Sequence, residues 1–265
     1  MIFHSAFEYN YLWLPLVGFI IGLLAAIIGG GGGFFFPPIL MLFFKVDAQV
    51  AVATSLAATL PICVVGAIGH YRHKNIDVRM GAIFGAAGIL GALLGASLTG
   101  LMTAETLKTT FGVYSILLAI VMVFNNYRDK RARAKGKEIP NGLTAGRISR
   151  GSFYGFIGGL ITGTFGTSGT APVLAGLFAL GLPLKLVVGT SLMVIFINTV
   201  SALGAHFLVG QIDMTLVYFL AGGAMIGAFF GTRFLTNVRI IRTEGSIKFW
   251  YAIAIAFFGL IMILS

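Results

Sequence analysis

Ten residues near the start of the chain, Gly29 to Pro38 (GGGGGFFFPP), constrain its fold most. Five consecutive glycines interrupt an apolar run that begins near Tyr11 and ends near Phe44. Glycine disfavours a helix interior by roughly 1 kcal/mol relative to alanine, so five in a row end a helix. Pro37 and Pro38 follow, and proline suits the first turn of a new helix. We therefore predict a helix, a bare backbone break and a new helix; an ordinary loop between two spans is the alternative.

Composition places this break inside a membrane protein. Hydrophobic residues make up 58% of the 265 positions and charged residues 10%, which excludes a soluble globular domain. Non-helical backbone at membrane depth is tolerated only where it is buried in protein or lines a cavity. A single cysteine in an apolar run leaves no disulfide framework and no thiolate metal site. We expect an all-α polytopic membrane protein in the lipid bilayer, without a cofactor, a metal or catalytic residues.

Apolar segments divide the chain into full spans and shorter pieces. A helix needs about 20 residues to cross the hydrocarbon core of a bilayer. Three segments beside the breaks, 34–44, 152–164 and 171–182, are too short to span it alone. The segments that reach or approach the required length are 48–70, 79–99, 107–125, 186–206, 216–236 and 247–264.

The two halves of the chain repeat at a constant offset of 136 residues. The matches run without a gap from Gly22 and Gly158 to Gly95 and Gly231, farther than chance similarity between apolar segments. We predict a first transmembrane repeat over 1–127, a basic linker over 128–150 and a second repeat over 151–265. The matches between them include Gly30 with Gly166, Gly33 with Gly169, Thr54-Ser55-Leu56 with Thr190-Ser191-Leu192, and His70 with His206.

Equivalent loops of the two repeats carry opposite charge signals. Basic residues mark cytoplasmic loops, and here they produce a net charge of +10 that indicates topology and no nucleic-acid partner. The loop at 71–79 has three basic residues, whereas its partner at 207–215 has none. The loop at 100–107 has none, whereas its partner region has Arg233, Arg239 and Arg242. We predict that the second repeat is inverted, with both termini periplasmic and the linker cytoplasmic.

An inverted-topology repeat makes each half a broken glycine-tipped hairpin plus three full transmembrane helices. The two tips then meet near the midplane, although two full crossings over 11–44 would satisfy the same parity. Each break opens a short helix whose N-terminus carries roughly +0.5 charge, which favours a small anion. The carbonyl ends of the preceding helices allow a cation such as sodium instead. No carboxylate lies inside a span, which favours the anion; close helix packing is the purely structural alternative.

The predicted substrate-binding residues come from both breaks and from the hydroxyl pair that follows each of them. Such hydroxyls can instead bond to a carbonyl one turn back in their own helix. His70 and His206 are candidates for a proton relay, or are simply well placed at helix C-termini. The substrate-binding set is Gly31, Gly32, Gly33, Phe34, Thr54, Ser55, Gly166, Thr167, Ser168, Gly169, Thr170, Thr190 and Ser191.

Three motifs together carry a family resemblance. A glycine-rich break is followed by VATSL at 52–56 and by GHYRHKNID at 69–77, all inside a duplicated unit. This pattern resembles the TauE/SafE sulfite exporter family, also called the 4-toluene sulfonate uptake permeases. The resemblance implies a transporter of sulfite, sulfonates or related anions in the bacterial inner membrane. It leaves open the anion, the direction of transport, the coupling ion (proton or sodium) and a homodimer.

One enzyme alternative comes from a second, shorter resemblance. GTSG at 166–169 and AHFLVG at 205–210 are similar to the serine and histidine motifs of rhomboid-type intramembrane proteases. A catalytic Ser–His pair has to approach within about 3 Å. Ser168 is expected at a hairpin tip and His206 near the far end of a span, which argues against this pair.

Labelling from the two sides of the membrane tests the predicted topology. Single cysteines at Gln211 and at Gly136, in a Cys63→Ala background, are expected to react with a membrane-impermeant maleimide from opposite sides. Labelling of both positions from the same side would contradict the predicted inverted repeat. It would also contradict the placement of the two tips together, which depends on that repeat.

Overall fold

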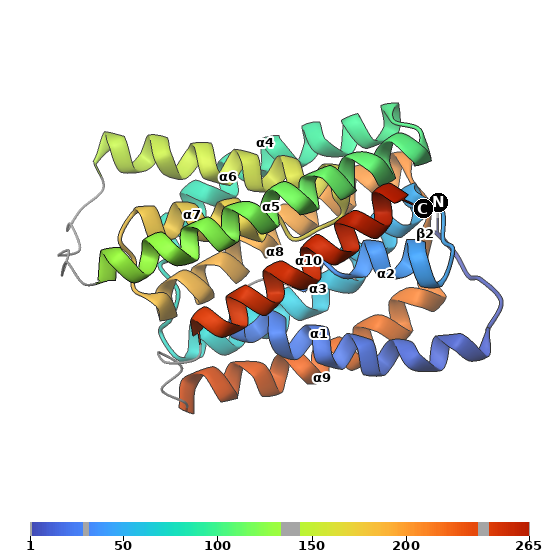
Figure 1. The fold of residues 1–265 in the computed structure, drawn as a ribbon, viewed down its shortest axis with the longest axis horizontal. Coiled ribbons are helices and arrows are strands. Elements are labelled where there is room, and N and C mark those ends of the chain that lie inside the picture. The colour runs from blue at the N-terminus through green and yellow to red at the C-terminus, as the bar shows by residue number, and fades with distance from the viewer. Residues whose placement is uncertain (1, 29–31, 134–143, 238–243, 265) are drawn as a thin grey trace.

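The computed structural model describes residues 2–28, 32–133, 144–237 and 244–264. In this part of the chain ten α-helices form one elongated bundle (Figure 1). A 3-10 helix, η1 (Tyr9–Trp13), precedes them, and strand β1 (Ile2–Phe3) pairs in parallel with β2 (Ile212–Asp213). The α-helices are α1 (Leu14–Ile28), α2 (Phe36–Phe43), α3 (Ala48–Arg72), α4 (Val78–Leu101), α5 (Ala104–Arg133), α6 (Ala145–Phe165), α7 (Thr170–Ala179), α8 (Leu184–Val209), α9 (Met214–Asn237) and α10 (Glu244–Leu264).

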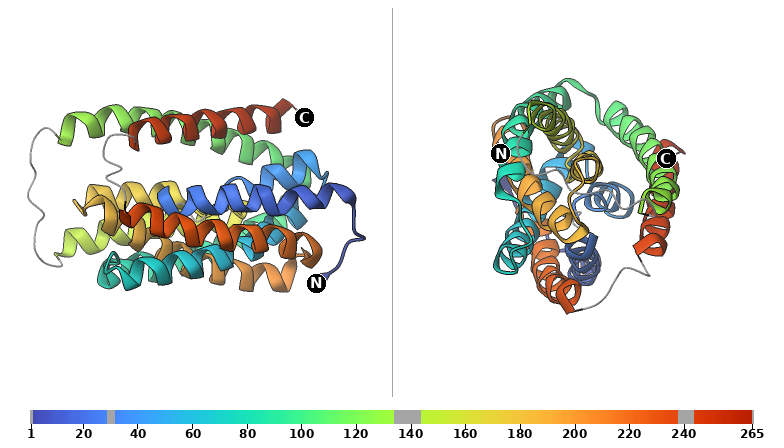
Figure 2. Two further views of the ribbon diagram at one scale, coloured as in Figure 1. Left: turned by 90° about the horizontal axis from the view of Figure 1, so that it is seen from below. Right: turned by 90° about the vertical axis from the view of Figure 1, so that its left-hand side faces the viewer.

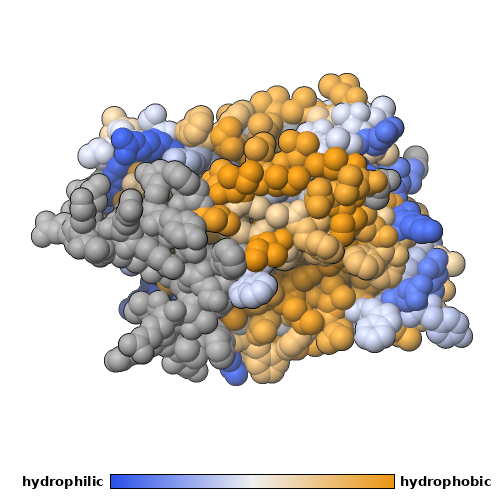
Figure 3. All heavy atoms as spheres, viewed as in Figure 1, coloured by the Kyte–Doolittle hydropathy of each residue, from blue (hydrophilic) through white to orange (hydrophobic). Residues whose placement is uncertain are grey.

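The bundle is that of an all-α polytopic membrane protein, as the composition predicts. Apolar side chains cover the middle of the face shown in Figure 3, and hydrophilic ones gather toward its ends. The apolar stretch of α10 in the described residues, Ala252–Leu264, is short. Six described segments are long and apolar enough to cross a bilayer: Tyr9–Ile27, Ala48–Arg72, Val78–Leu101, Ala104–Val123, Leu184–Leu208 and Met214–Arg233.

Each break joins a long helix to a short one. The helices that follow the breaks, α2 and α7, have 8 and 10 residues and therefore rise only about 12 and 15 Å. The helix before the second break, α6, has 21 residues, although its apolar segment at 152–164 was expected to be too short to span. It is longer because it begins at Ala145, within the segment predicted as linker. Arg147 at this end donates to the Leu180 carbonyl (3.3 Å). Since α5 extends to Arg133, the connection between the halves is shorter than 128–150.

Repeat-equivalent helices α4 and α9 run in opposite directions. α3 begins beside the start of α9, where Thr54 Oγ1 accepts from the Asp213 amide (3.1 Å). α3 also ends beside the end of α9, where a Cβ on Gly69 would lie 3.0 Å from the Thr232 side chain. α3 and α9 are therefore parallel, whereas α4 turns back from α3 after a short connection. These directions are the ones that an inverted-topology repeat requires.

Glycines bring helix backbones into direct contact in the two most extensive helix pairs, α1–α9 and α4–α6. A Cβ atom built on Gly223 would lie 1.8 Å from the Pro15 carbonyl oxygen. One built on Gly159 would lie 2.0 Å from the carbonyl oxygen of Gly88. Close backbone approach is the main source of packing energy between helices in lipid, where the hydrophobic effect does not draw them together.

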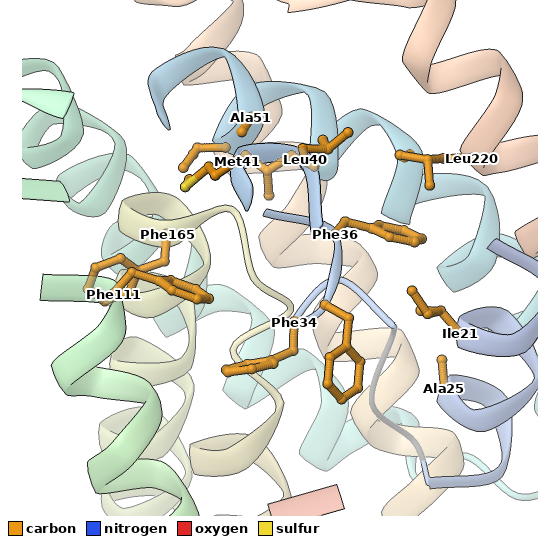
Figure 4. Close-up of a cluster of buried hydrophobic side chains, with 14 of the residues drawn as sticks. Ile21, Ala25, Phe34, Phe36, Leu40, Met41, Ala51, Phe111, Phe165 and Leu220 are labelled. Atoms are coloured by element: carbon orange, nitrogen blue, oxygen red, sulfur yellow. The ribbon is translucent and has the colours of Figure 1, made fainter. Parts of the chain in front are cut away.

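Helices α5 and α10 pack against each other on one side of the bundle (Figure 2). Aromatic rings connect this pair to the breaks. The Phe111 ring in α5 lies 5.5 Å from the Phe34 ring and 5.6 Å from the Phe165 ring, centroid to centroid. The centroid of the Phe258 ring in α10 lies 5.9 Å from that of the Phe35 ring. Phe34, which follows the first glycine break, and Phe165, which precedes the second, thus both pack against Phe111 (Figure 4).

Two neighbouring glycines in α9 provide a matched stability test. Gly223→Ala is expected to lower the free energy of unfolding by about 1–3 kcal/mol, because its Cβ collides with the backbone of α1. Gly222→Ala meets nothing within 4 Å and is expected to be neutral or to stabilise by up to about 1 kcal/mol through helix propensity. Thermal unfolding in detergent measures both. Equal melting temperatures of the two variants would contradict the α1–α9 contact.

Candidate functional site

The two glycine-rich breaks meet inside the bundle. A Cβ atom on Gly33 would lie 3.2 Å from the Ser168 amide nitrogen and 2.7 Å from Thr59 Oγ1. The backbone of the first break therefore lies close to that of the second break, and a side chain on Gly33 would collide with Thr59. Gly32 has φ +73°, a conformation that favours glycine. Gly31, which was also predicted to bind substrate, lies outside the described residues.

Two glycines with positive φ shape the second break. Gly166 (φ +66°) ends α6 in the left-handed conformation, and its amide donates to the Thr162 carbonyl (3.0 Å). Gly169 (φ +51°) precedes α7, and a Cβ there would lie 2.0 Å from the Gly158 carbonyl oxygen. The chain thus reverses and returns along α6 in a space that only glycine can occupy.

Side chains from three other helices satisfy the carbonyl end of α6. Thr99 Oγ1 in α4 donates to the carbonyl of Thr164 (2.8 Å) and lies 3.3 Å from that of Gly163. His206 Nε2 in α8 donates to the Gly163 carbonyl (2.7 Å). Ser55 Oγ in α3 donates to the Gly166 carbonyl (3.0 Å) as well as to Val52 in its own helix. The carbonyl oxygens of Gly163, Thr164 and Gly166 at this end each accept a side-chain hydrogen bond, which makes them less available to a cation.

At both breaks, the residue that precedes the new helix does not cap it with its own side chain. Neither Phe35, which precedes α2, nor Gly169, which precedes α7, provides a capping hydrogen bond. Backbone N–H groups and the helix dipole favour negative charge at such an end. The two ends are not equivalent, however, because Pro37 and Pro38 remove two N–H groups from the first turn of α2. The predicted site is therefore richer in donors on the side of α7.

Four buried polar side chains have no hydrogen-bond partner among the described residues: Thr59, Thr167, Asn198 and Thr199. Each is at most 1% exposed. A buried polar group without a partner costs about 1–3 kcal/mol, so an unpartnered group in a native structure indicates an unfilled role. Thr59 lies where the breaks meet, and Thr167 lies in the second break.

Thr59 and Thr199 lie near the middle of the antiparallel pair formed by α3 and α8. A Cβ on Gly189 would lie 3.1 Å from the His70 side chain, so α8 begins where α3 ends. A Cβ on Gly210 would lie 3.7 Å from the Ala53 Cβ, so α8 ends where α3 begins. The unpartnered hydroxyls of both helices are consequently at the depth of the breaks.

Two predicted ligands do not lie at the meeting point of the breaks. Thr54 Oγ1 accepts from the Asp213 amide, and Thr190 Oγ1 accepts from the Asp77 amide (2.8 Å). These repeat-equivalent threonines hold the turns before α9 and α4 at opposite ends of the bundle. Ser191 Oγ donates to the carbonyl of Val188 in its own helix, the alternative considered for such hydroxyls (2.8 Å).

The remaining predicted residues lie in or beside one of the two breaks or in the aromatic contact. Thr170 Oγ1 donates to Ser168 Oγ (2.9 Å), while His206 bonds to a carbonyl. The Nε2 atom of His206, the histidine of the protease alternative, is thus occupied by a backbone carbonyl. His70 Nε2 lies 3.4 Å from the Ala26 carbonyl oxygen, so both histidines contact the last turn of the helix that precedes a break. Phe34 is 4% exposed and packs on Phe111.

A comparison of the chain with protein families decides its identity. Residues 14–262 match the model of the family described as sulfite exporter TauE/SafE. The chain belongs to the TauE/SafE family. The match covers both breaks and most or all of every span, so the resemblance in the sequence motifs is confirmed.

Curated relatives of this TauE/SafE member carry transporter names. It is 29% identical to the probable membrane transporter protein YdhB of Bacillus subtilis (strain 168), over 84% of this chain and 89% of the relative. It is 27% identical to YunE of the same organism, over 81% and 82%. A probable membrane transporter protein of Xylella fastidiosa (strain 9a5c) is 29% identical over 74% of each chain. No solved structure matches. The family consists of membrane transporters rather than enzymes, which confirms that expectation.

Sequence reasoning missed Thr59, Asn198 and Thr199. A signal was available for Asn198, because a carboxamide in an apolar span is costly and indicates a functional or packing role. The threonines gave no such signal, because hydroxyls in membrane helices usually bond to their own backbone.

Two threonines in α3 separate an unpartnered hydroxyl from a bonded one. In the ligand-free protein, Thr59→Val is expected to raise the free energy of unfolding by about 1 kcal/mol or more, because it removes a buried group without a partner. Thr54→Val is expected to lower it by about 1–3 kcal/mol, because the Asp213 amide loses its acceptor. Thermal unfolding in detergent measures both changes, and a destabilised Thr59→Val variant would show that Thr59 has a structural partner.

Proposed function

We propose that this TauE/SafE transporter moves a small monovalent sulfur oxyanion, hydrogensulfite or an organosulfonate, across the bacterial inner membrane. The substrate binds where the two breaks meet. One observation carries the choice of an anion over a cation. The carbonyls of Gly163, Thr164 and Gly166 at the end of α6 accept hydrogen bonds from His206, Thr99 and Ser55, while Gly169, which precedes the following helix, has no side chain to cap its N–H groups.

The charge of the predicted site favours a monoanion. A helix N-terminus contributes roughly half a positive charge, and the unpartnered side chains at the breaks are neutral. A sulfonate or hydrogensulfite is nearly neutralised by two such ends. A dianion such as sulfate keeps an uncompensated charge in a low-dielectric environment, which costs several kcal/mol.

The arrangement of the helices supports alternating access between the two halves. Repeat-equivalent helices run in opposite directions, and the two breaks come together between the halves. This is the arrangement of transporters in which one repeat rocks against the other around a site at the membrane midplane. A coupling ion and a homodimer stay open.

Charge at the two ends of the bundle supports the predicted topology. Asn75 approaches Gly189 and Arg147 bonds to Leu180, so the α3–α4 turn and the starts of α6 and α8 share one end. The other end, where Gln49 donates to the Met102 carbonyl, holds the chain termini (Figure 1). The basic residues Arg72, Lys74, Arg79, Arg147 and Lys185 belong to the first end, and Lys45 and Lys108 to the other. We assign the first end to the cytoplasm.

A charge substitution in the second break tests the anion site. Thr167→Asp is expected to abolish binding of methanesulfonate, because a carboxylate repels the anion at short range. Thr167→Asn, of the same shape and without charge, is expected to retain binding within about tenfold. Calorimetry on the detergent-purified protein measures both, with sulfate as a second ligand.

Binding that survives in Thr167→Asp, or sulfate bound as tightly as the sulfonate, would overturn the proposal and favour the cation alternative. The repeat-equivalent region of the first break is a poor place for this test. Gly32 has positive φ, and a Cβ there would lie 2.9 Å from Ile21, so Gly32→Asp would strain the backbone as well as add charge.

A further inference from the structure

The side chain of Asn198 lies in the interior of the bundle with nothing to bond to. It is 0% exposed, and neither Oδ1 nor Nδ2 has a hydrogen-bond partner among the described residues. It occupies the junction of α4, α6 and α8. A Cβ on Gly88 would lie 2.1 Å from its Oδ1, and a Cβ on Gly158 would lie 3.8 Å from its Nδ2. Two glycines thus leave room for a carboxamide.

Helix packing alone does not explain an asparagine at this position. Its repeat equivalent is Ile62, whose Cδ1 would lie 3.3 Å from a Cβ on Gly32 in the first break. An apolar side chain fills the corresponding space there at no cost in desolvation. A carboxamide buried without partners is costly, whereas leucine has nearly the same size. The second half therefore carries a polar group that the fold does not need.

Asn198 lies beside the second break, next to the start of α7. The Cβ built on Gly158, which would lie near Asn198 Nδ2, would also lie 3.2 Å from the Gly169 carbonyl oxygen. The preceding residue, Ser168, lies next to Gly33 and Thr59 at the meeting point of the breaks. The second break thus has Thr59 near Ser168 and the Asn198 carboxamide near Gly169.

We propose that Asn198 determines specificity by binding a second hydrogen-bonding group of the substrate, such as a hydroxyl on a small sulfonate. The inference rests on the proposed function and narrows it: the sulfonate head binds at the breaks, and the substituent reaches the carboxamide. A hydroxyl both donates and accepts, so it satisfies Oδ1 and Nδ2 together. An alkyl group satisfies neither.

A matched pair of ligands tests this role. Calorimetry on the purified full chain compares 2-hydroxyethanesulfonate with ethanesulfonate, which differ by one hydroxyl. The wild-type protein is expected to prefer the hydroxylated ligand by about tenfold or more, because unpaired buried polar groups reject the analogue. Asn198→Leu is expected to reduce this preference to about one by weakening only the hydroxylated ligand. Ser201→Ala is the control, since Ser201 bonds to Ile197 in its own helix and is expected to keep the preference.

Each result has a defined meaning. Equal binding of the two sulfonates to the wild-type protein, or a preference that persists in Asn198→Leu, would overturn the role of Asn198 and leave the anion site standing. Failure of the wild-type protein to bind either sulfonate while it binds hydrogensulfite would overturn this inference alone, and failure to bind all three anions would overturn the proposed function as well. If Asn198→Leu does not fold, Asn198→Ala replaces it, because alanine removes the carboxamide without adding bulk. The comparison of the two sulfonates on the wild-type protein needs no variant.

Discussion

A helix that ends inside the membrane leaves carbonyl groups that water cannot reach, and the rest of this structure depends on how those groups are satisfied. At the end of α6 the donors are Thr99, His206 and Ser55, which come from α4, α8 and α3. Three helices that are distant in sequence must therefore surround one break. The break does more than interrupt the bundle, because the need to hydrogen-bond its carbonyl groups determines which helices lie beside it.

Backbone contact between helices makes these hydrogen bonds geometrically accessible. A Cβ on Gly95 would lie 2.2 Å from the Leu160 carbonyl oxygen, and one on Gly163 would lie 2.1 Å from that of Ala92. At this separation the short side chain of Thr99 reaches carbonyls on α6 as well as its own helix. Larger side chains at the glycine positions would push α4 and α6 apart and leave the end of α6 unsatisfied. Close helix packing and the hydrogen bonding of buried carbonyls thus depend on the same glycines. Replacing one of these glycines with a larger residue is therefore costly in stability.

The sequence predicts the fold well because hydropathy, glycine and proline act locally. Full spans follow from the length of apolar runs, and the two breaks follow from glycines that precede a proline. The roles of individual hydroxyls could not be predicted in this way. Thr54 and Thr59 lie five residues apart in one apolar helix, yet only Thr54 meets a backbone amide, because β2 passes beside it. Whether a hydroxyl is bonded depends on its neighbours in space. The start of α6 was missed for a related reason: Arg147 and Arg150 precede the apolar run but lie inside the helix.

At the predicted repeat offset, the two halves place different side chains at equivalent positions. The equivalents of the unpartnered groups Thr167, Asn198 and Thr199 are Gly31, Ile62 and Cys63, and the equivalent of Thr59 is Ile195. Three of the four polar groups thus belong to the second half. In the proposed transport cycle the substrate would bind mainly to that half. The first break presents Gly32 against the apolar side chains of Ile21 and Ile62, which make no directional bonds. Thr59, which lies beside Gly33, is the polar group that the first half would add to the site, so the proposed site is asymmetric in its hydrogen-bonding groups.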